Sequence, residues 1–233
     1  MKDETKFLIE IADKFGTDAQ NILDFIAYPR NLEKAAKALS KAEVAGSNED
    51  LPDGVYFIAE NRTSYQLMTD GTTAPHFPTK YIGVKVGQRA IAVALKDLPG
   101  DNDGVLRLLP REHTSPETSE RCSYDTASED YRFNAFEDFD GQANTARLKE
   151  YGCTIDLPEG EWIPSMGELA LLMMHASKVN RAIELAGGEP IEGWHWSSTE
   201  RSQCSAWYVS FSSGSTNYYG KYVFYAVRTV STF

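Results

Sequence analysis

The last forty residues, Trp194 to Phe233, constrain the fold most strongly, because their middle alternates as only a β-strand does. Large apolar side chains fall on one side of an extended chain: Trp207, Val209 and Phe211. Hydroxyl-bearing side chains fall on the other side: Tyr208, Ser210 and Ser212. We therefore expect the first side to face a core. We expect the second side to face outward, because Tyr and Ser are typical of binding loops.

Composition indicates a globular protein and narrows its partners. The 233 residues suffice for one large domain, or for one domain with a small appendage. No run approaches the roughly 18 apolar residues that a membrane span needs, so we expect no span. The net charge of -11 opposes a phosphate backbone, so we expect no nucleic-acid partner.

Neither the cysteines nor the acidic turns predict a metal site or a cofactor. Cys122, Cys153 and Cys204 are an odd number without a CxxC motif, so a disulfide framework is not expected and a single bridge stays open. The acidic turns at 101–104 and 137–141 do not complete a calcium-binding loop. Asp and Gly suit ordinary turns, and we expect ordinary turns here.

The N-terminal residues 3–45 have helical spacing, and the polar stretch 47–54 marks a boundary after them. Two interpretations stay open for these helices: a cap on the main domain, or a docking and oligomerisation module. The first sixteen residues do not form the continuous apolar block of a secretory signal. We therefore expect a protein made in the bacterial cytoplasm without a signal peptide.

The central residues predict strands followed by one helix. Strands are expected at 55–60, at 64–69 and at 81–98, the last with a turn at Gly87. Residues 99–152 are polar and look irregular. Ser165 and Glu168 form the pattern of a capping box, and the helix that they open is expected to continue past His175 to Leu185.

An enzyme needs a nucleophile, a base or a metal, and the sequence offers only one weak combination. Cys204 lies near His195 along the chain, and a Cys/His pair is conceivable there. No signature surrounds Cys204, and no GxSxG, phosphate-binding or dinucleotide-binding motif is present. We therefore predict a protein that is not an enzyme.

Six short pieces, in order, resemble one known family. They are IAVALKDL (91–98), DGQANT (140–145), WIPSMGEL (162–169), WSSTE (196–200), AWYVSF (206–211) and VRTVSTF (227–233). Together they resemble the C-type-lectin-like, formylglycine-generating-enzyme-like fold of Bacteroidales surface proteins and of the variable proteins of diversity-generating retroelements. The resemblance implies an α+β, C-type-lectin-like domain at 52–233. The small helical segment expected at 1–46 falls outside the resemblance.

In the retroelement proteins, a reverse transcriptase rewrites adenines near the 3′ end of the gene, so outward residues vary on a fixed scaffold. The resemblance implies that the scaffold here includes Trp162, Glu168, Trp196, Trp207, Phe211 and Arg228. It implies that the variable, ligand-binding residues are Arg201, Ser202, Ser205, Tyr208, Ser210, Ser212, Ser213, Ser215, Thr216, Asn217, Tyr218, Tyr219, Tyr222, Phe224 and Tyr225.

Two departures from the family limit what it implies. Glu189-Pro190 is followed by Ile191 rather than by Asn, so calcium-dependent sugar binding of the lectin type is not implied. The redox-active cysteines of the formylglycine-generating enzymes have no match either.

These observations predict a non-enzymatic receptor-binding protein, such as the fibre or tail-tip adhesin of a bacteriophage virion, attached to a Bacteroides host. Its partners would be a host cell-surface protein or glycan, other virion subunits contacted through the N-terminal helices, and sister subunits in a homotrimer. Two alternatives stay open. One is a virion structural or decoration protein of fixed sequence, and the other is a related oxidase that reacts through Cys204.

Overall fold

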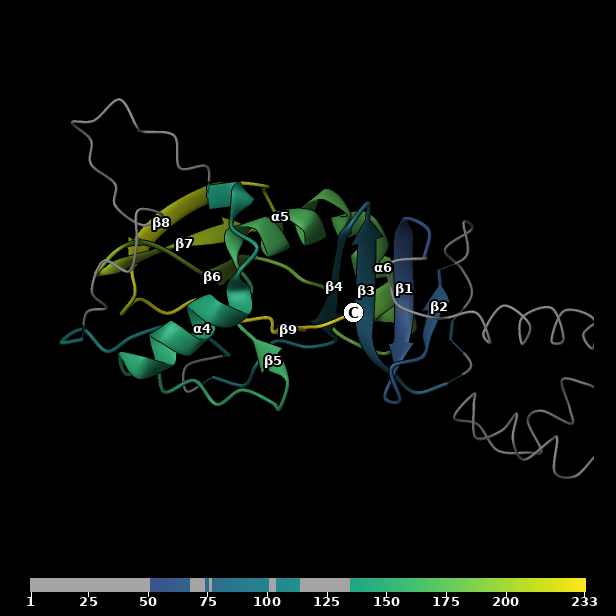
Figure 1. Ribbon diagram of the computed structural model, residues 1–233, viewed down its shortest axis with the longest axis horizontal. Helices are drawn as coiled ribbons and strands as arrows, with labels where there is room; N and C mark the ends of the chain where they lie inside the picture. Colours follow the sequence, from purple (N-terminus) through teal and green to yellow (C-terminus); the bar gives the residue numbers. More distant parts are fainter. Residues whose placement is uncertain (1–50, 68–73, 76, 101–103, 114–134) are drawn as a thin grey trace, which may run out of the picture.

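A computed structural model of the chain describes residues 51–67, 74–75, 77–100, 104–113 and 135–233. The predicted N-terminal helices, His76 and Cys122 lie outside the described residues. Within them, two antiparallel sheets occupy the two ends of an elongated molecule, and helices lie between and beside them (Figure 1). The expected α+β class is confirmed.

The first sheet contains six antiparallel strands in the order β2-β1-β3-β4-β9-β5. They span β1 (Gly54–Ala59), β2 (Ser64–Gln66), β3 (Thr79–Val86), β4 (Arg89–Ala94), β5 (Glu161–Trp162) and β9 (Val230–Ser231). The expected turn between β3 and β4 is confirmed, with Val86 paired to Arg89 across two residues. Gly87 takes a φ of 55° there, a conformation that glycine adopts without strain.

The second sheet contains three antiparallel strands, with β7 between the other two. They are β6 (Trp194–Ser202), β7 (Ser205–Ser210) and β8 (Thr216–Gly220). Residues 207–210 of the alternation thus belong to a strand, as the sequence predicts, and that strand is the central one. Phe211 follows it directly. The last strand, β9, belongs to the first sheet, so the residues between β8 and β9 connect the two sheets.

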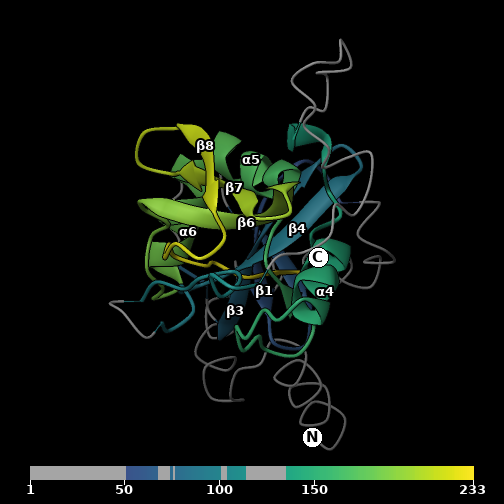
Figure 2. The ribbon, with the colours of Figure 1, turned by 90° about the vertical axis from the view of Figure 1, so that its left-hand side faces the viewer.

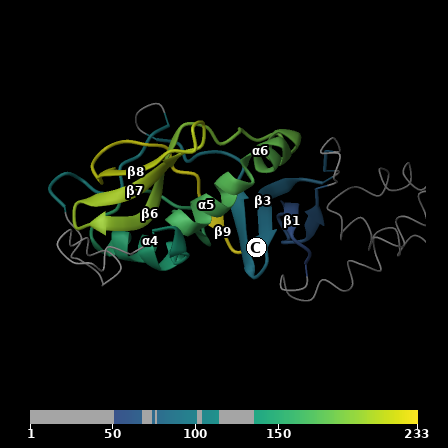
Figure 3. The same cartoon turned by 90° about the horizontal axis from the view of Figure 1, so that it is seen from above.

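The helix expected from Ser165 to Leu185 is two helices: α5 (Met166–Met174) and α6 (Ala176–Leu185), with His175 at the break. The prediction of one continuous helix was wrong because the two halves serve different sheets. α5 packs on β6 and β7, whereas α6 packs on β1 and β3 (Figure 3). The capping box of Ser165 and Glu168 is confirmed.

The irregular segment expected at 99–152 is wrong in its last part, which contains a short 3-10 helix, η2 (Ala135–Glu137), and α4 (Gly141–Glu150). α4 escapes a search for apolar periodicity because its buried side is mainly small and polar. The buried residues are Gly141, Asn144, Thr145 and Leu148. Polar groups can be buried in this way only where each finds a hydrogen-bond partner. Thr145 exchanges hydrogen bonds with the backbone of Ile163.

The Asp138 carboxylate supplies the partner of Asn144 where α4, α5 and β6 meet. Its Oδ2 accepts hydrogen bonds from the Asn144 amide at 2.8 Å and the Thr199 hydroxyl at 2.7 Å. Its Oδ1 accepts one from the backbone N–H of Asp140 at 3.0 Å. The Thr199 oxygen in turn accepts the N–H of Met166 at 2.8 Å. One buried carboxylate therefore positions the first turns of two helices against a strand.

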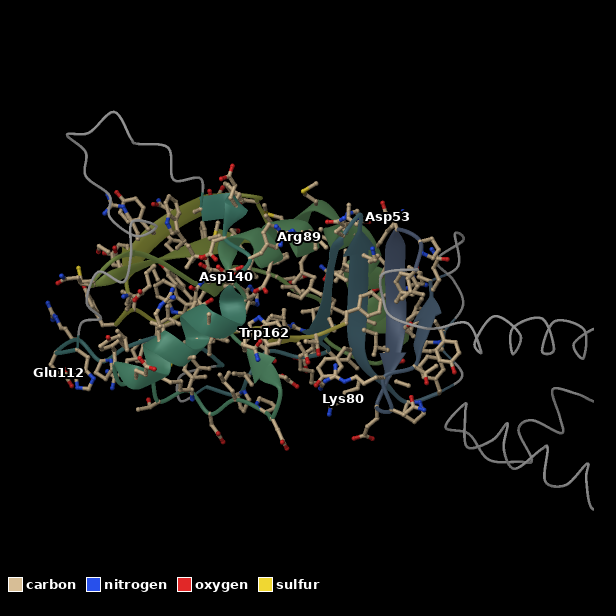
Figure 4. The ribbon with its side chains drawn as sticks, viewed as in Figure 1. Asp53, Lys80, Arg89, Glu112, Asp140 and Trp162 are labelled. Carbon is tan, nitrogen blue, oxygen red and sulfur yellow. The ribbon has the colours of Figure 1, made fainter. Side chains whose placement is uncertain are left out.

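The capping box extends this network. The Ser165 hydroxyl donates to the backbone carbonyl of Asp138 at 2.7 Å, and its N–H donates to the Glu168 carboxylate at 2.7 Å. The Trp162 indole N–H reaches the same carboxylate at 3.2 Å. Trp162, in the edge strand β5 of the first sheet, and Asp140 both lie near the middle of the molecule (Figure 4). The motifs DGQANT, WIPSMGEL and WSSTE therefore converge on one buried site.

Burial raises the pKa of Glu168 from its ordinary 4.5 to about 7, and the charge of Asp138 adds to the rise. Hydrogen bonds from Ser165 and Trp162 oppose it. A shift of this size corresponds to about 3 kcal/mol. The folded state holds the Glu168 proton more tightly than the unfolded chain does. The contribution of this proton to the free energy of unfolding is therefore complete below pH 4.5 and is lost as the pH rises through about 7.

We therefore expect the free energy of unfolding to fall between about pH 5 and pH 7.5 by up to about 3 kcal/mol. Glu168→Gln removes the titrating group and keeps a capping-box residue, so it should flatten this slope. Urea unfolding across the pH range measures it, with Glu137→Gln, an exposed acid of η2, as the control. An equally steep slope in Glu168→Gln would contradict the assignment.

Candidate binding surface

Exposed aromatic side chains gather at the end of the molecule formed by the second sheet. Large exposed aromatics lie on β6, on β8 and just after β8: Trp194, Tyr218, Tyr219, Tyr222 and Phe224. Tyr219 is the most exposed of them, at 52%. Figure 2 looks at this end, where β8 and the yellow C-terminal segment lie in front.

The fifteen residues expected to face outward divide into three groups. Exposed are Ser212, Ser213, Ser215, Asn217, Tyr218, Tyr219, Tyr222 and Phe224. Half-buried are Arg201, Ser202, Thr216 and Tyr225. Buried are Ser205, Tyr208 and Ser210.

The outward position expected for the three buried residues is therefore wrong. β7 lies between β6 and β8, and both of its faces are covered. Val209 packs against Met166 and Leu169 of α5. On the other face, Tyr208 packs against Val227 in the segment that returns to the first sheet. The alternation predicts the strand correctly. The hydroxyl-bearing side chains on β7 are nevertheless buried rather than exposed to solvent.

Aromatic rings that pack tilted or edge-on against one another support the surface from beneath. The Tyr208 ring lies 4.5 Å from that of Tyr225 and 5.9 Å from that of Trp196, between ring centroids. The buried Trp196 indole N–H donates to the carbonyl oxygens of Leu106 at 3.0 Å and Val223 at 3.2 Å. Burial, with a hydrogen bond to Tyr208, raises the pKa of Tyr225 to about 12. The Tyr225 hydroxyl therefore stays protonated at neutral pH. Its ring packs with those of Tyr208 and Trp196 beneath the surface.

The residues expected to form the scaffold are mostly buried. Trp162, Glu168, Trp196 and Arg228 are buried, whereas Trp207 and Phe211 are half-buried. Both half-buried rings pack against the cluster beneath α5. The Trp207 ring also meets the Tyr218 ring edge-on at 5.4 Å, so it reaches the rim of the surface.

Arginines lie over three of the exposed or rim aromatics. Arg201 lies 3.8 Å from the centroid of Tyr218, Arg111 5.2 Å from that of Tyr222, and Arg107 5.9 Å from that of Phe224. Sequence reasoning missed Arg107, Arg111 and Trp194. Nothing in the spacing of the two arginines links them to rings more than a hundred residues away. Trp194 had a usable signal, since it begins the aromatic stretch.

A buried ion pair anchors the turns beside the surface. Lys221 follows β8 and pairs with Glu200 of β6, and both side chains are at least 96% buried. The Lys221 ammonium also donates to the carbonyl of Gln203 at 3.0 Å. The pair thus connects the end of β8 to the β6–β7 turn. Sequence reasoning missed this pairing, because the two residues lie 21 positions apart and share no motif.

Arg228 closes the C-terminal segment against the first sheet. Its guanidinium donates to the Asp97 carboxylate at 2.6 Å and to the carbonyls of Ala94 at 3.2 Å and Glu189 at 3.0 Å. The buried His195 contacts the same carboxylate at 3.0 Å. Burial alone would raise the pKa of Asp97, but His195 and Arg228 outweigh it and hold that pKa below its ordinary value.

The conceivable Cys204/His195 pair is not formed. His195 pairs with Val209 near the start of β6, whereas Cys204 lies in the turn beyond the other end. Because β6 is extended between them, the His195 and Cys204 side chains are about 20 Å apart. Cys204 and Cys153 are free thiols, and Cys153 is buried. Among the described residues, no three His, Cys, Asp or Glu side chains are grouped so as to hold a metal ion.

No helix within the described ranges is both long and apolar enough to cross a bilayer. The fold defines a mixed α+β protein with two antiparallel sheets. The sequence matches no protein family and no curated protein.

The fold is similar to the crystal structure of a fimbrial protein from Bacteroides ovatus, with a TM-score of 0.50 and 17% sequence identity. The match covers 78% of this chain and 49% of the fimbrial protein, so the chain spans about half the length of that protein. At this identity the similarity concerns the fold alone. The C-type-lectin-like assignment stays a prediction, as do the domain boundaries at 1–46 and 52–233.

The Lys221–Glu200 pair yields a test of how the surface is held. Lys221→Met leaves the Glu200 carboxylate buried beside an apolar side chain and should lower the free energy of unfolding by about 3–5 kcal/mol. Glu200→Leu added to Lys221→Met removes the buried charge that has lost its ammonium and should recover most of that loss. Denaturant unfolding of both variants measures this. A double variant no more stable than the single one would show that the buried charge is not the cause.

Proposed function

We propose that this chain is a non-enzymatic binding protein whose contact surface is the aromatic end of the second sheet. The observation that carries the proposal is the distribution of exposed aromatics. Of the seven large hydrophobic side chains that are exposed among the described residues, five lie in the last forty residues. Such clusters on a soluble surface mark interaction sites.

The surface suits binding because its scaffold is held from below. Tyr219 and Tyr222 project from a strand and a segment fixed by the buried Trp196 and by the Lys221–Glu200 pair. Tyr has few rotatable bonds and combines apolar area with a hydroxyl, so it loses little entropy on binding. The exposed Asn217 lies two residues before Tyr219 on β8 and supplies an adaptable hydrogen-bonding group on the same side of the strand.

The partner in this proposal is a cell-surface protein or glycan of a bacterial host, and the role is that of an adhesin. The fold shared with a fimbrial protein supports a role at a surface. Two settings fit it: a bacteriophage fibre or tail tip, which is the setting predicted from the sequence, and the bacterial cell surface. The second candidate function is a fixed contact with a neighbouring subunit, which the same exposed tyrosines favour.

Alanine variants test the proposed surface. Labelled full-length protein is applied to a glycan array and to intact bacterial cells, and bound protein is read by fluorescence. Tyr218→Ala, Tyr219→Ala, Tyr222→Ala and Phe224→Ala should each weaken binding, by roughly tenfold where the ring is a central contact. Met174→Ala, at the exposed C-terminal end of the otherwise largely buried α5, is the control and should bind normally.

Equal binding by all variants would overturn the assignment of the surface. Loss of self-association in the same variants, measured by light scattering, would favour the subunit contact instead.

Deep sequencing of the 3′ end of the gene in a growing population tests diversification. If the surface is diversified, substitutions should cluster at exposed positions such as Asn217 and Tyr219. Trp207, Tyr208 and Arg228 should stay constant, because each supports the sheet. A uniform sequence would argue for a fixed contact surface.

A further inference from the structure

Two of the exposed aromatics form a ladder with two arginines at the far end of the second sheet. Residues 106–109 run antiparallel beside residues 221–225. The Leu106 N–H donates to the Tyr225 carbonyl at 2.8 Å, and the Tyr225 N–H donates back at 3.1 Å. The Leu109 N–H donates to the Lys221 carbonyl at 3.1 Å. These two segments of the chain form a short ribbon, and its hydrogen bonds fix the positions of the side chains that project from it.

The ribbon turns one set of side chains inward and another outward. Val223 and Tyr225 pack inward on the cluster around Trp196. Tyr222 and Phe224, which alternate with them, are each 38% exposed. Arg111 and Arg107 are exposed and lie over those two rings, so the outer side presents two arginine–aromatic pairs in a row. We call these four residues the arginine ladder.

The arginine ladder has unused capacity for anions. Stacking on a ring occupies the face of a guanidinium and leaves its in-plane N–H donors for another partner. No carboxylate among the described residues forms an ion pair with Arg107 or Arg111. Carboxylates accept two parallel hydrogen bonds from a guanidinium, which makes them the matching group.

The charge of the chain is distributed in the same sense. Residues 201–233 contain no Asp or Glu and three basic residues. Two of the three, Lys221 and Arg228, are buried against Glu200 and Asp97, so the charge left for a ligand is mainly that of the exposed Arg107 and Arg111. Figure 4 places Glu112, the neighbour of Arg111, at the end of the molecule opposite Asp53 of the first sheet. An anionic partner is therefore accommodated by these two exposed arginines rather than by the basic residues of 201–233.

We propose that the arginine ladder binds an acidic polysaccharide, with sugar carboxylates on Arg107 and Arg111 and sugar rings against Tyr222 and Phe224. Sugar rings present apolar C–H faces and polar edges, which suits an aromatic ring flanked by guanidinium donors. A polymer repeats its carboxylates at sugar spacing and can contact both pairs at once. This inference rests on the proposed binding function and names the chemical class of its partner.

Binding to defined polymers tests the inference. Full-length protein is titrated with polygalacturonate, with neutral dextran and with poly-L-glutamate, and affinity is read by biolayer interferometry. Polygalacturonate should bind, and raising the salt from low to high ionic strength should weaken its binding. Arg107→Gln combined with Arg111→Gln should reduce affinity by about tenfold or more. Arg→Lys at both positions keeps the charge but not the planar donors and should fall between.

The matched control is Lys80→Gln with Lys178→Gln, which removes two exposed charges outside the ladder. Lys80 also lies over a ring, that of Tyr81 in the first sheet, at 5.5 Å. This control should bind polygalacturonate as the parent protein does. Thermal melting and circular dichroism show whether each variant is folded.

The outcomes separate this inference from the proposed function. Binding to dextran alone, or a ligand from the glycan array whose binding ignores the arginine variants, would overturn the inference and leave the binding surface in place. Equal or tighter binding of poly-L-glutamate would replace the sugar by an acidic peptide and overturn it too. Failure of every polymer, together with aromatic variants that change nothing on cells, would overturn both.

Discussion

The buried carboxylate of Asp138 is the interaction on which the rest of the described structure depends. The carboxylate accepts hydrogen bonds from Asn144 and Thr199, and the backbone carbonyl of Asp138 accepts one from Ser165. Because a buried charge without partners is strongly unfavourable, the three elements that carry those donors must arrive together. α4, α5 and β6 thereby take one arrangement, and the apolar clusters on either side form around it.

That arrangement decides which side chains reach solvent. With α5 fixed against β6, one face of the central strand β7 is covered, and Val209 is buried there. The C-terminal segment, tied to the first sheet by Arg228 and Asp97, covers the other face and buries Tyr208. The exposed side chains of this sheet therefore lie mainly on the outer strand β8 and on the residues after it, and they include Tyr219 and Tyr222.

The resulting surface combines rigid rings with charged donors. Arg201, Arg107 and Arg111 each lie over an aromatic ring at this end of the molecule. Ring and guanidinium hold each other, so fewer rotamers are lost when a ligand arrives. The Lys221–Glu200 pair is buried nearby and supports the turns without competing for the ligand. Contact area and charge thus come from different residues on one scaffold.

The sequence by itself determined the features that depend on local spacing. These are the strands around Gly87, the capping box at Ser165 and the strand character of residues 207–210. It also located the aromatic end, since Tyr218, Tyr219, Tyr222 and Phe224 were expected outward and are exposed.

Only the tertiary structure decided what depends on distant partners. The polar buried side of α4 requires Asp138, the break at His175 requires two separate sheets, and the burial of Tyr208 requires a cover on each face of β7. The pairing of Arg107 with Phe224 likewise requires two chain segments to run side by side. Local periodicity records which residues share a face, and the rest of the chain determines what covers that face.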